Sequence, residues 1–110
     1  MLLRMSQLTY RVLVRGKFDR PDDETRARLL SGVAELAPFA FTEDGTFSYS
    51  SSLGSFTFRC VVFADSDGAA EQDAREQAEL KAMELLEGLS YPYRDLTAFA
   101  TCMDRIKINR

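Results

Sequence analysis

The segment Ser55–Ala64, with the sequence SFTFRCVVFA, constrains the fold more than any other part of the chain. It is rich in aromatic and β-branched residues and contains neither Pro nor Gly, which is typical of a central β-strand. One set of alternating positions is apolar: Phe56, Phe58, Cys60 and Val62. The other set is mixed: Thr57, Arg59, Val61 and Phe63. Because side chains alternate across a strand, the first set should face a dry core and the second a half-covered surface.

Two other segments show the same alternation. Leu8–Arg15 ends before Gly16; its apolar positions are Leu8, Tyr10, Val12 and Val14, and its mixed positions are Thr9, Arg11, Leu13 and Arg15. Tyr93–Met103 has the apolar positions Leu96, Ala98, Ala100 and Cys102, and the mixed positions Tyr93, Asp95, Thr97, Phe99 and Thr101. These patterns predict a first and a last strand, each with one core-facing side.

Two helices are predicted between these strands. The first runs from about Asp22 to Leu36, opens with acidic residues that favour a helix N-terminus, and ends before Pro38. Its apolar residues recur at helical spacing: Leu29, Leu30, Val33 and Leu36. The second runs over Ala69–Leu89, after capping residues at 65–68, with an apolar stripe made of Ala74, Ala78, Ala82, Leu85 and Leu89.

The segment between the first helix and the central strand allows two interpretations. Phe39–Thr42 alternates, Glu43-Asp44-Gly45 is a turn signal, and Thr46–Ser50 alternates again. It is either two short strands forming a hairpin, which we favour, or one long strand with a bulge at Asp44 and Gly45.

The predicted order is strand, helix, strand or hairpin, strand, helix, strand. This order fits a ferredoxin-like α+β sandwich, a split βαβ arrangement with an antiparallel or mixed sheet. Two right-handed crossovers would place both helices on one face of the sheet. Leu8–Arg15 and Ser55–Ala64, the most apolar strands, should lie side by side and parallel in the middle.

The composition fits one globular domain that spans 1–110, with 1–6 and 105–110 as flexible tails. Of 110 residues 45% are hydrophobic, and eight Phe and four Tyr can build a core without disulfides. No apolar run approaches the roughly 20 residues of a membrane span, and the start of the chain lacks a signal-peptide pattern. We therefore expect a cytoplasmic protein that does not bind membranes.

Several function classes are disfavoured. The net charge of −3 provides no basic field for nucleic acid, and the aromatic residues Phe56 and Phe58 should point into the core instead of stacking on bases. The chain has no His, which excludes Ser–His and Cys–His dyads and most zinc sites. We predict no catalytic residue, no metal ligand and no cofactor.

The cysteines and the acidic pairs have structural explanations. Cys60 and Cys102 should lie on strands that flank the first strand, roughly 9–10 Å apart, which is beyond disulfide reach. Two acidic pairs, Asp22 with Asp23 and Asp65 with Asp67, stand at the predicted helix starts, where capping explains them.

The open face of the sheet is the candidate binding site. Arg11 and Arg59 should lie on neighbouring strands, where two cations could hold the carboxylate or phosphate of a small anionic ligand. The candidate ligand-binding residues are Arg11, Arg15, Arg59, Thr57 and Tyr93, with Thr46–Ser50 as a possible wall. In the alternative interpretation, which we favour, the arginines pair with local acids such as Asp95 or Glu43.

The same face should also be apolar enough to form an interface. Its candidate interface residues are Leu13, Val61, Phe63 and Phe99, and a patch of this kind usually marks an interaction surface. Two such sheets can pack face to face as a symmetric homodimer, although a flap of the same chain could cover the patch instead.

Several motifs carry a resemblance to a known family. They are YRVLVRGKFD at 10–19, Phe39-Ala40-Phe41-Thr42 with Gly45, Phe56-Thr57-Phe58-Arg59, and Tyr91-Pro92-Tyr93 followed by Arg94-Asp95-Leu96. From about Leu8 to Met103 the chain resembles a family of short proteins of unknown function found mainly in actinobacteria. The resemblance implies a small cytoplasmic bacterial protein and supplies no catalytic residues.

Three hypotheses about function follow. The first is a non-catalytic, homodimeric module that binds a small molecule or a protein through the open face. The second is a structural domain whose open face is only a dimer seam. The third is an enzyme of the dimeric α+β barrel type, which the missing His disfavours. A cavity beside Arg11 and Arg59 would favour the first hypothesis.

Overall fold

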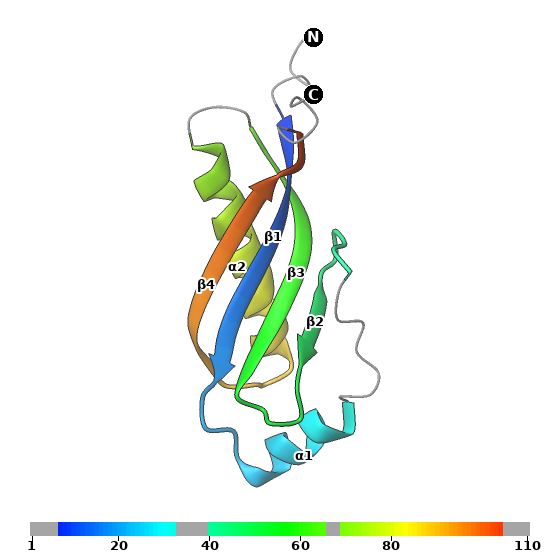
Figure 1. Cartoon of the computed structure of the whole chain (residues 1–110). Helices are drawn as coiled ribbons and strands as arrows, with labels where there is room; N and C mark the ends of the chain where they lie inside the picture. Colours follow the sequence, from blue (N-terminus) through cyan, green and yellow to red (C-terminus); the bar gives the residue numbers. More distant parts are fainter. Residues whose placement is uncertain (1–6, 33–39, 66–68, 105–110) are drawn as a thin grey trace.

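Four strands and two helices alternate along the chain in the computed structural model, which describes residues 7–32, 40–65 and 69–104 (Figure 1). The elements are β1 (Gln7–Phe18), α1 (Asp23–Gly32), β2 (Thr46–Tyr49), β3 (Ser55–Asp65), α2 (Ala70–Gly88) and β4 (Tyr93–Cys102). The tails expected at 1–6 and 105–110 lie outside the described residues.

The strands form one antiparallel sheet in the order β2-β3-β1-β4. The two most apolar strands, β1 and β3, are central as predicted, and Val12 lies opposite Cys60. Their predicted parallel orientation is wrong, since they are antiparallel. The short turn between β2 and β3 makes these two strands antiparallel, and the crossover through α1 leaves β2 parallel to β1. β3 lies between β1 and β2 and is therefore antiparallel to both.

The predicted core-facing sides of β1 and β3 are confirmed. The fully buried apolar side chains of these two strands are Tyr10, Val12, Val14, Phe18, Phe56, Phe58, Cys60, Val62 and Ala64. β1 does not end before Gly16 as predicted but continues to Phe18. A Cβ atom at Gly16 would lie 2.6 Å from the ring of Phe56 and 2.7 Å from Leu96, so this glycine makes room for the core without ending the strand.

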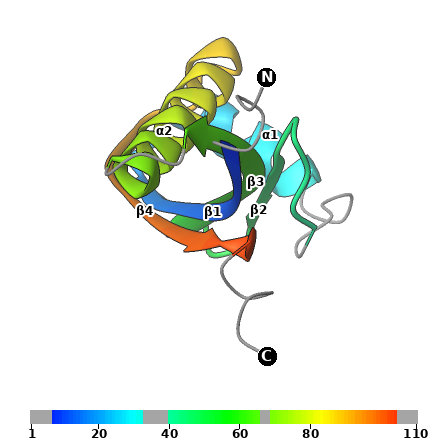
Figure 2. The same ribbon diagram turned by 90° about the horizontal axis from the view of Figure 1, so that it is seen from above.

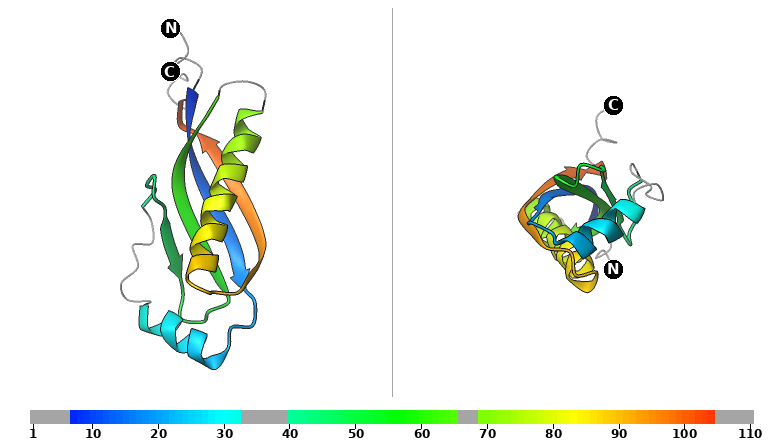
Figure 3. Two further views of the ribbon diagram at one scale, coloured as in Figure 1. Left: turned by 180° about the vertical axis from the view of Figure 1, so that it is seen from behind. Right: turned by 90° about the horizontal axis from the view of Figure 1, so that it is seen from below.

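Helix α2 lies along the core side of the sheet, over β4, β1 and β3 (Figure 3). Its buried stripe has a spacing of four residues and consists of Ala70, Ala74, Ala78, Ala82 and Leu86. Small side chains in this stripe allow the helix to approach the strands closely. The stripe ends on Leu86 and not on Leu89 as predicted, because Leu89 is the C-cap, beyond the last helical residue, and is 42% exposed.

Helix α1 is described over Asp23–Gly32, and its predicted continuation to Leu36 lies outside the described residues. The helix does not lie beside α2. It crosses the end of the sheet (Figures 1 and 2). Of its predicted apolar residues, Leu29 is buried and Leu30 is 48% exposed, while Val33 and Leu36 lie outside the described residues. The phenol of Tyr49 donates a hydrogen bond of 2.7 Å to the carbonyl oxygen of Leu29, which ties the helix to β2.

A second core of aromatic side chains fills the space between α1 and the sheet. Phe18 is at its centre, with ring centroids 5.0 Å from Phe56, 5.5 Å from Tyr49 and 6.3 Å from Phe47. Such edge-on and tilted arrangements are favourable for aromatic rings beyond the area that they bury. This cluster joins α1 to the strands, in place of the predicted position on one face of the sheet beside α2.

The segment before β3 contains one short strand and one isolated bridge. β2 is confined to Thr46–Tyr49, while Thr42 only bridges Cys60, with the N–H of Val61 donating to the carbonyl of Thr42 at 2.8 Å. The turn between them is confirmed, because Gly45 has a φ of 94°. Phe39 lies outside the described residues.

The cysteines and the first acidic pair behave as predicted. Cys60 and Cys102 are both free thiols. Asp22 caps α1, since its Oδ1 accepts a hydrogen bond of 2.8 Å from the N–H of Thr25. The second acidic pair does not cap α2: Asp65 is the last residue of β3, Asp67 lies outside the described residues, and the N-cap is Ala69 with no side-chain hydrogen bond.

Gly45→Ala should destabilise the protein by about 2–4 kcal/mol, which urea denaturation will measure. An L-residue is strained at this φ, and the added Cβ would lie 2.1 Å from the buried ring of Phe58. Gly88→Ala is the matched control, because a Cβ there meets nothing within 4 Å. Equal effects of the two substitutions would contradict this account of the turn.

Acid should weaken the capping of α1. The hydrogen bond from the N–H of Thr25 lowers the pKa of Asp22 from its ordinary value of 3.8. The folded state therefore holds the proton less well than the unfolded state, so the stabilisation is present above pH 3.8 and is lost as the pH falls through the lowered pKa. Urea denaturation should show that the native chain loses stability relative to the Asp22→Asn variant as the pH falls through that range. A difference independent of pH would contradict the prediction.

Candidate functional site

The side of the sheet opposite α2, which we call the open face, carries the mixed positions of β1, β3 and β4. Leu13 is central to it, lying opposite Arg59 on β3 and Phe99 on β4. Arg11 lies opposite Val61 and Thr101, and Arg15 lies opposite Thr57 and Thr97. Arg59 is therefore a diagonal neighbour of both Arg11 and Arg15, and the three predicted arginines surround one leucine.

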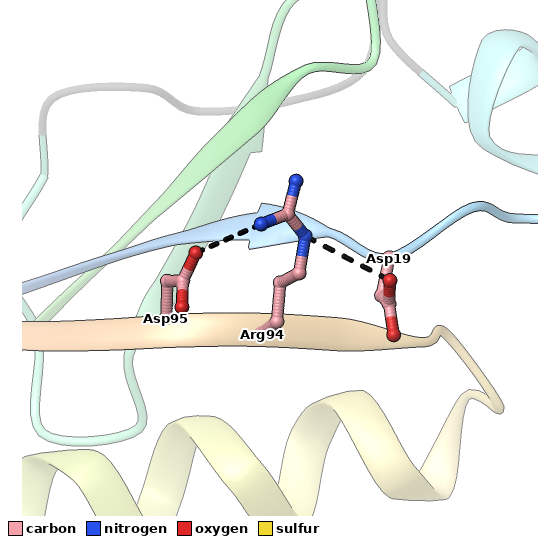
Figure 4. Close-up of polar contacts among 3 residues, drawn as sticks. All are labelled: Asp19, Arg94 and Asp95. Atoms are coloured by element: carbon pink, nitrogen blue, oxygen red, sulfur yellow. Dashed lines mark hydrogen bonds and ion pairs between the residues drawn. The ribbon is translucent and has the colours of Figure 1, made fainter.

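Asp95, one of the two local acids proposed as arginine partners, is engaged elsewhere. Asp95 pairs with Arg94 at 3.0 Å, and Arg94 also lies 3.7 Å from Asp19 (Figure 4). In residues 7–32, 40–65 and 69–104, neither Arg11 nor Arg15 forms an ion pair with a carboxylate. The favoured interpretation, in which local acids neutralise these two arginines, is not supported within the described chain.

Arg11 and Arg59 each contact an uncharged group. The guanidinium of Arg11 lies over the ring of Phe41, 5.4 Å from its centroid. Nη1 of Arg59 donates to Oγ of Ser48 at 3.2 Å, so β2 contacts this arginine. A cation over an aromatic face keeps its charge available to a further partner, because the ring contributes no formal negative charge.

Two hollows lie on the open face, on either side of Phe99, whose side chain is 53% exposed. The larger, which we call the Arg11 hollow, has a volume of about 350 Å³ and is lined by Arg11, Leu13, Phe41, Phe99, Thr101 and Met103. The other, the Arg15 hollow, has a volume of about 270 Å³ and is lined by Arg15, Gly16, Lys17, Ser55, Asp95, Thr97 and Phe99. A cavity beside Arg11 is thus present, whereas Arg59 lines neither hollow.

Tyr93 does not belong to the open face. The pairing of β1 with β4 shifts by one residue between Arg15 and Lys17, and Asp95 has a φ of 58°. This bulge reverses the alternation, so Tyr93 lies opposite buried Phe18 and joins the aromatic core. Thr57 is on the open face, but it lines a separate hollow of about 290 Å³ beside Ser48 and Ser50.

The predicted interface residues do not all lie next to one another on the open face. Leu13 and Phe99 are direct neighbours, and Val61 is diagonal to Leu13. Phe63 is 43% exposed but lies opposite Thr9, two positions farther along the sheet. Sequence reasoning missed Phe41, Lys17 and Met103 as lining residues, and the alternation of Phe39–Thr42 before the turn was the only signal that could have pointed to Phe41.

Burial raises the pKa of the Cys60 thiol, and burial also raises that of Tyr49. A hydrogen bond to Glu87, 2.9 Å long, raises the pKa of Tyr93.

The described residues contain no cluster of three or more His, Cys, Asp or Glu able to hold a metal ion. Of the described helices, none has the length and apolar character needed to cross a membrane.

Residues 5–110 match the model of a family of unknown function, DUF6204. The chain belongs to this family. Neither the curated proteins nor the solved structures contain a significant match. DUF6204 membership confirms the predicted resemblance to a family of unknown function and assigns no role to any residue.

The bulge in this DUF6204 chain can be tested at Asp95. Asp95→Gly should leave stability unchanged or raise it, because glycine adopts positive φ freely, whereas Asp95→Val should cost about 1–2 kcal/mol. Thr97→Val is the control, since Thr97 is regularly paired in the same strand. Thermal or urea denaturation will measure the three variants. A tolerated valine at position 95 would show that no left-handed bulge is needed.

Proposed function

We propose that the protein is a non-catalytic module that binds a small anionic molecule with an apolar body in the Arg11 hollow. The observation that carries the proposal is the composition of this hollow. One guanidinium without a carboxylate partner among the described residues stands beside the apolar side chains of Leu13, Phe41, Phe99 and Met103. Such a site combines one charged anchor with apolar walls, as small-molecule sites usually do.

The charged anchor is suited to a carboxylate or a similar planar anion. Arginine presents a rigid fork of N–H donors that matches two oxygen atoms of an anion. The ring of Phe41 supports the guanidinium from one side, which restricts its rotamers before a ligand arrives. Pre-organisation of this kind reduces the entropy lost on binding. The exposed ring of Phe99 provides a surface for the apolar part of the ligand.

The other two hypotheses have less support on this face. A pure dimer seam would not require a hollow beside an arginine. An enzyme needs a general acid, base or nucleophile placed at the reacting atoms. Among the described residues that line the Arg11 hollow, Thr101 has the only hydroxyl group, and no carboxylate or thiol adjoins it. Binding without catalysis is therefore the function that the geometry favours.

We also infer that the domain is a variant of the ferredoxin-like sandwich. The strand order β2-β3-β1-β4, with all neighbours antiparallel, and the two βαβ units support this inference. The variant feature is α1, which crosses the end of the sheet instead of lying beside α2 (Figure 1).

The proposal can be tested with 2-naphthoate, which combines a carboxylate with an aromatic body. In an NMR titration the amide signals of Leu13, Phe99 and Thr101 should shift. Arg11→Gln should weaken binding at least about tenfold, because a charge-assisted hydrogen bond contributes roughly 1.5–3 kcal/mol.

Two controls make this test specific. Arg26→Gln alters an exposed arginine of α1 and should leave binding unchanged. The neutral analogue 2-naphthalenemethanol should bind more weakly than 2-naphthoate. Equal binding of the two compounds, or full binding by Arg11→Gln, would show that the anion is not held by Arg11.

A further inference from the structure

The outer edge of β4 is the least protected part of the sheet. β4 is hydrogen-bonded to β1 on one side, and no described element lies along its other side (Figures 1 and 3). The segment Leu96–Cys102, with the sequence LTAFATC, contains no charged residue, no Pro and no Gly. Natural sheets usually protect a long free edge with such residues, because unpaired N–H and C=O groups recruit another strand.

We propose that this edge pairs with the same edge of a second copy of the chain. The two β4 strands would run antiparallel about a two-fold axis at Phe99, which extends the sheet across both copies. An antiparallel arrangement of two identical strands is self-complementary, as a symmetric homodimer requires. The inference is independent of the proposed ligand.

The register follows from the faces of the strand. Residues opposite each other in an antiparallel pair lie on the same face, so open-face residues must meet open-face residues. Centring the axis on Phe99 pairs Leu96 with Cys102 of the second copy and uses the whole uncharged segment. It also stops short of Asp95, where the bulge ends regular pairing. Centring the axis on Ala98 would instead bring Thr101 against Asp95 in the bulge.

This register gives complementary rows of side chains across the two copies. The middle row is Leu13, Phe99, Phe99 of the second copy and Leu13 of the second copy, which covers the exposed aromatic ring with another. On either side of this row, Arg11 lies beside Thr101 of its own chain. Thr101 then lies beside Thr97 of the second copy, and that Thr97 lies beside Arg15 of the second copy. The arginines within such a row are three strand spacings apart, about 14 Å, so like charges do not meet.

The ends of the paired segment carry opposite charges. Arg94 precedes the segment and Asp104 follows it. In this register Arg94 of each copy corresponds to Asp104 of the other, beyond the regular part of β4. The exposed guanidinium contacts Asp19 and Asp95, and one oxygen of Asp104 accepts from the N–H of Thr9, so each group has donor or acceptor capacity left for the second copy. This complementarity favours a second copy of the chain over an unrelated strand as the occupant of the edge.

The interface is small, because it rests on one short strand and a pair of phenylalanine rings. We therefore expect reversible association that depends on concentration, as for other interfaces of limited area. One consequence rests on the proposed function: the Arg11 hollow of one copy would adjoin the Arg15 hollow of the other, across Thr101 and Thr97. A longer or doubly charged anion could then reach both arginines.

Light scattering over a wide concentration range, without ligand, tests the interface. The native chain should shift toward the dimer mass as concentration rises. Phe99→Lys should remain monomeric, because two lysines would face each other at the axis, and Phe99→Glu should remain monomeric for the same reason. An equimolar mixture of these two variants should form a heterodimer, since opposite charges then meet. Circular dichroism checks that each variant is folded.

Phe63→Lys is the matched control, because Phe63 is an exposed open-face residue of β3, away from the β4 edge. It should dimerise like the native chain. A native chain that stays monomeric up to its solubility limit overturns the proposal. So does a dimer that Phe63→Lys disrupts and Phe99→Lys does not, which would indicate face-to-face packing of the sheets. Arg11→Gln should still dimerise, so failure of ligand binding and failure of dimerisation are distinguishable.

Discussion

The contact between the alanine stripe of α2 and the apolar side of β1 and β3 determines the rest of the structure. Four alanines spaced by four residues let the helix lie close to the strands, and Tyr10, Val12, Val14, Phe58 and Val62 are buried in the same core cluster. One face of the sheet is thereby used for stability. The arginines and the exposed phenylalanines remain on the other face because the alternation of β-strands leaves them no other place.

Much of this arrangement could be predicted from the sequence, because alternation along a strand is a local property. The core sides of β1 and β3 and the placement of Arg11, Arg15 and Arg59 on the open face needed only period-two patterns. The features that could not be predicted depend on distant contacts. A glycine such as Gly16 usually indicates the end of a strand. Here it lies within β1 because Phe56 and Leu96 occupy the space that a side chain would need. Similarly, α1 lies where the aromatic core holds it, and its apolar spacing alone did not indicate this position.

The candidate site was predictable in its charges but not in its shape. Arg11 was identified from its strand, yet the hollow beside it depends on Phe41, which reaches the site from outside the regular strands. Asp95 does not neutralise Arg11 or Arg15, because it lies in a bulge and turns toward Arg94. Ion pairing depends on the directions of side chains at irregular positions, and sequence spacing does not supply these directions.

The bulge at Asp95 has a consequence for how this chain can change over evolutionary time. Tyr93 and Phe99 are six positions apart, so a regular strand would present both rings on one face. The single extra residue separates them, and one ring stabilises the interior while the other is left on the surface. Deleting the extra residue would leave both rings on their present sides, because five positions would then separate them in a regular strand. The start of β4 can therefore lose this one residue and still keep the same division between interior and surface.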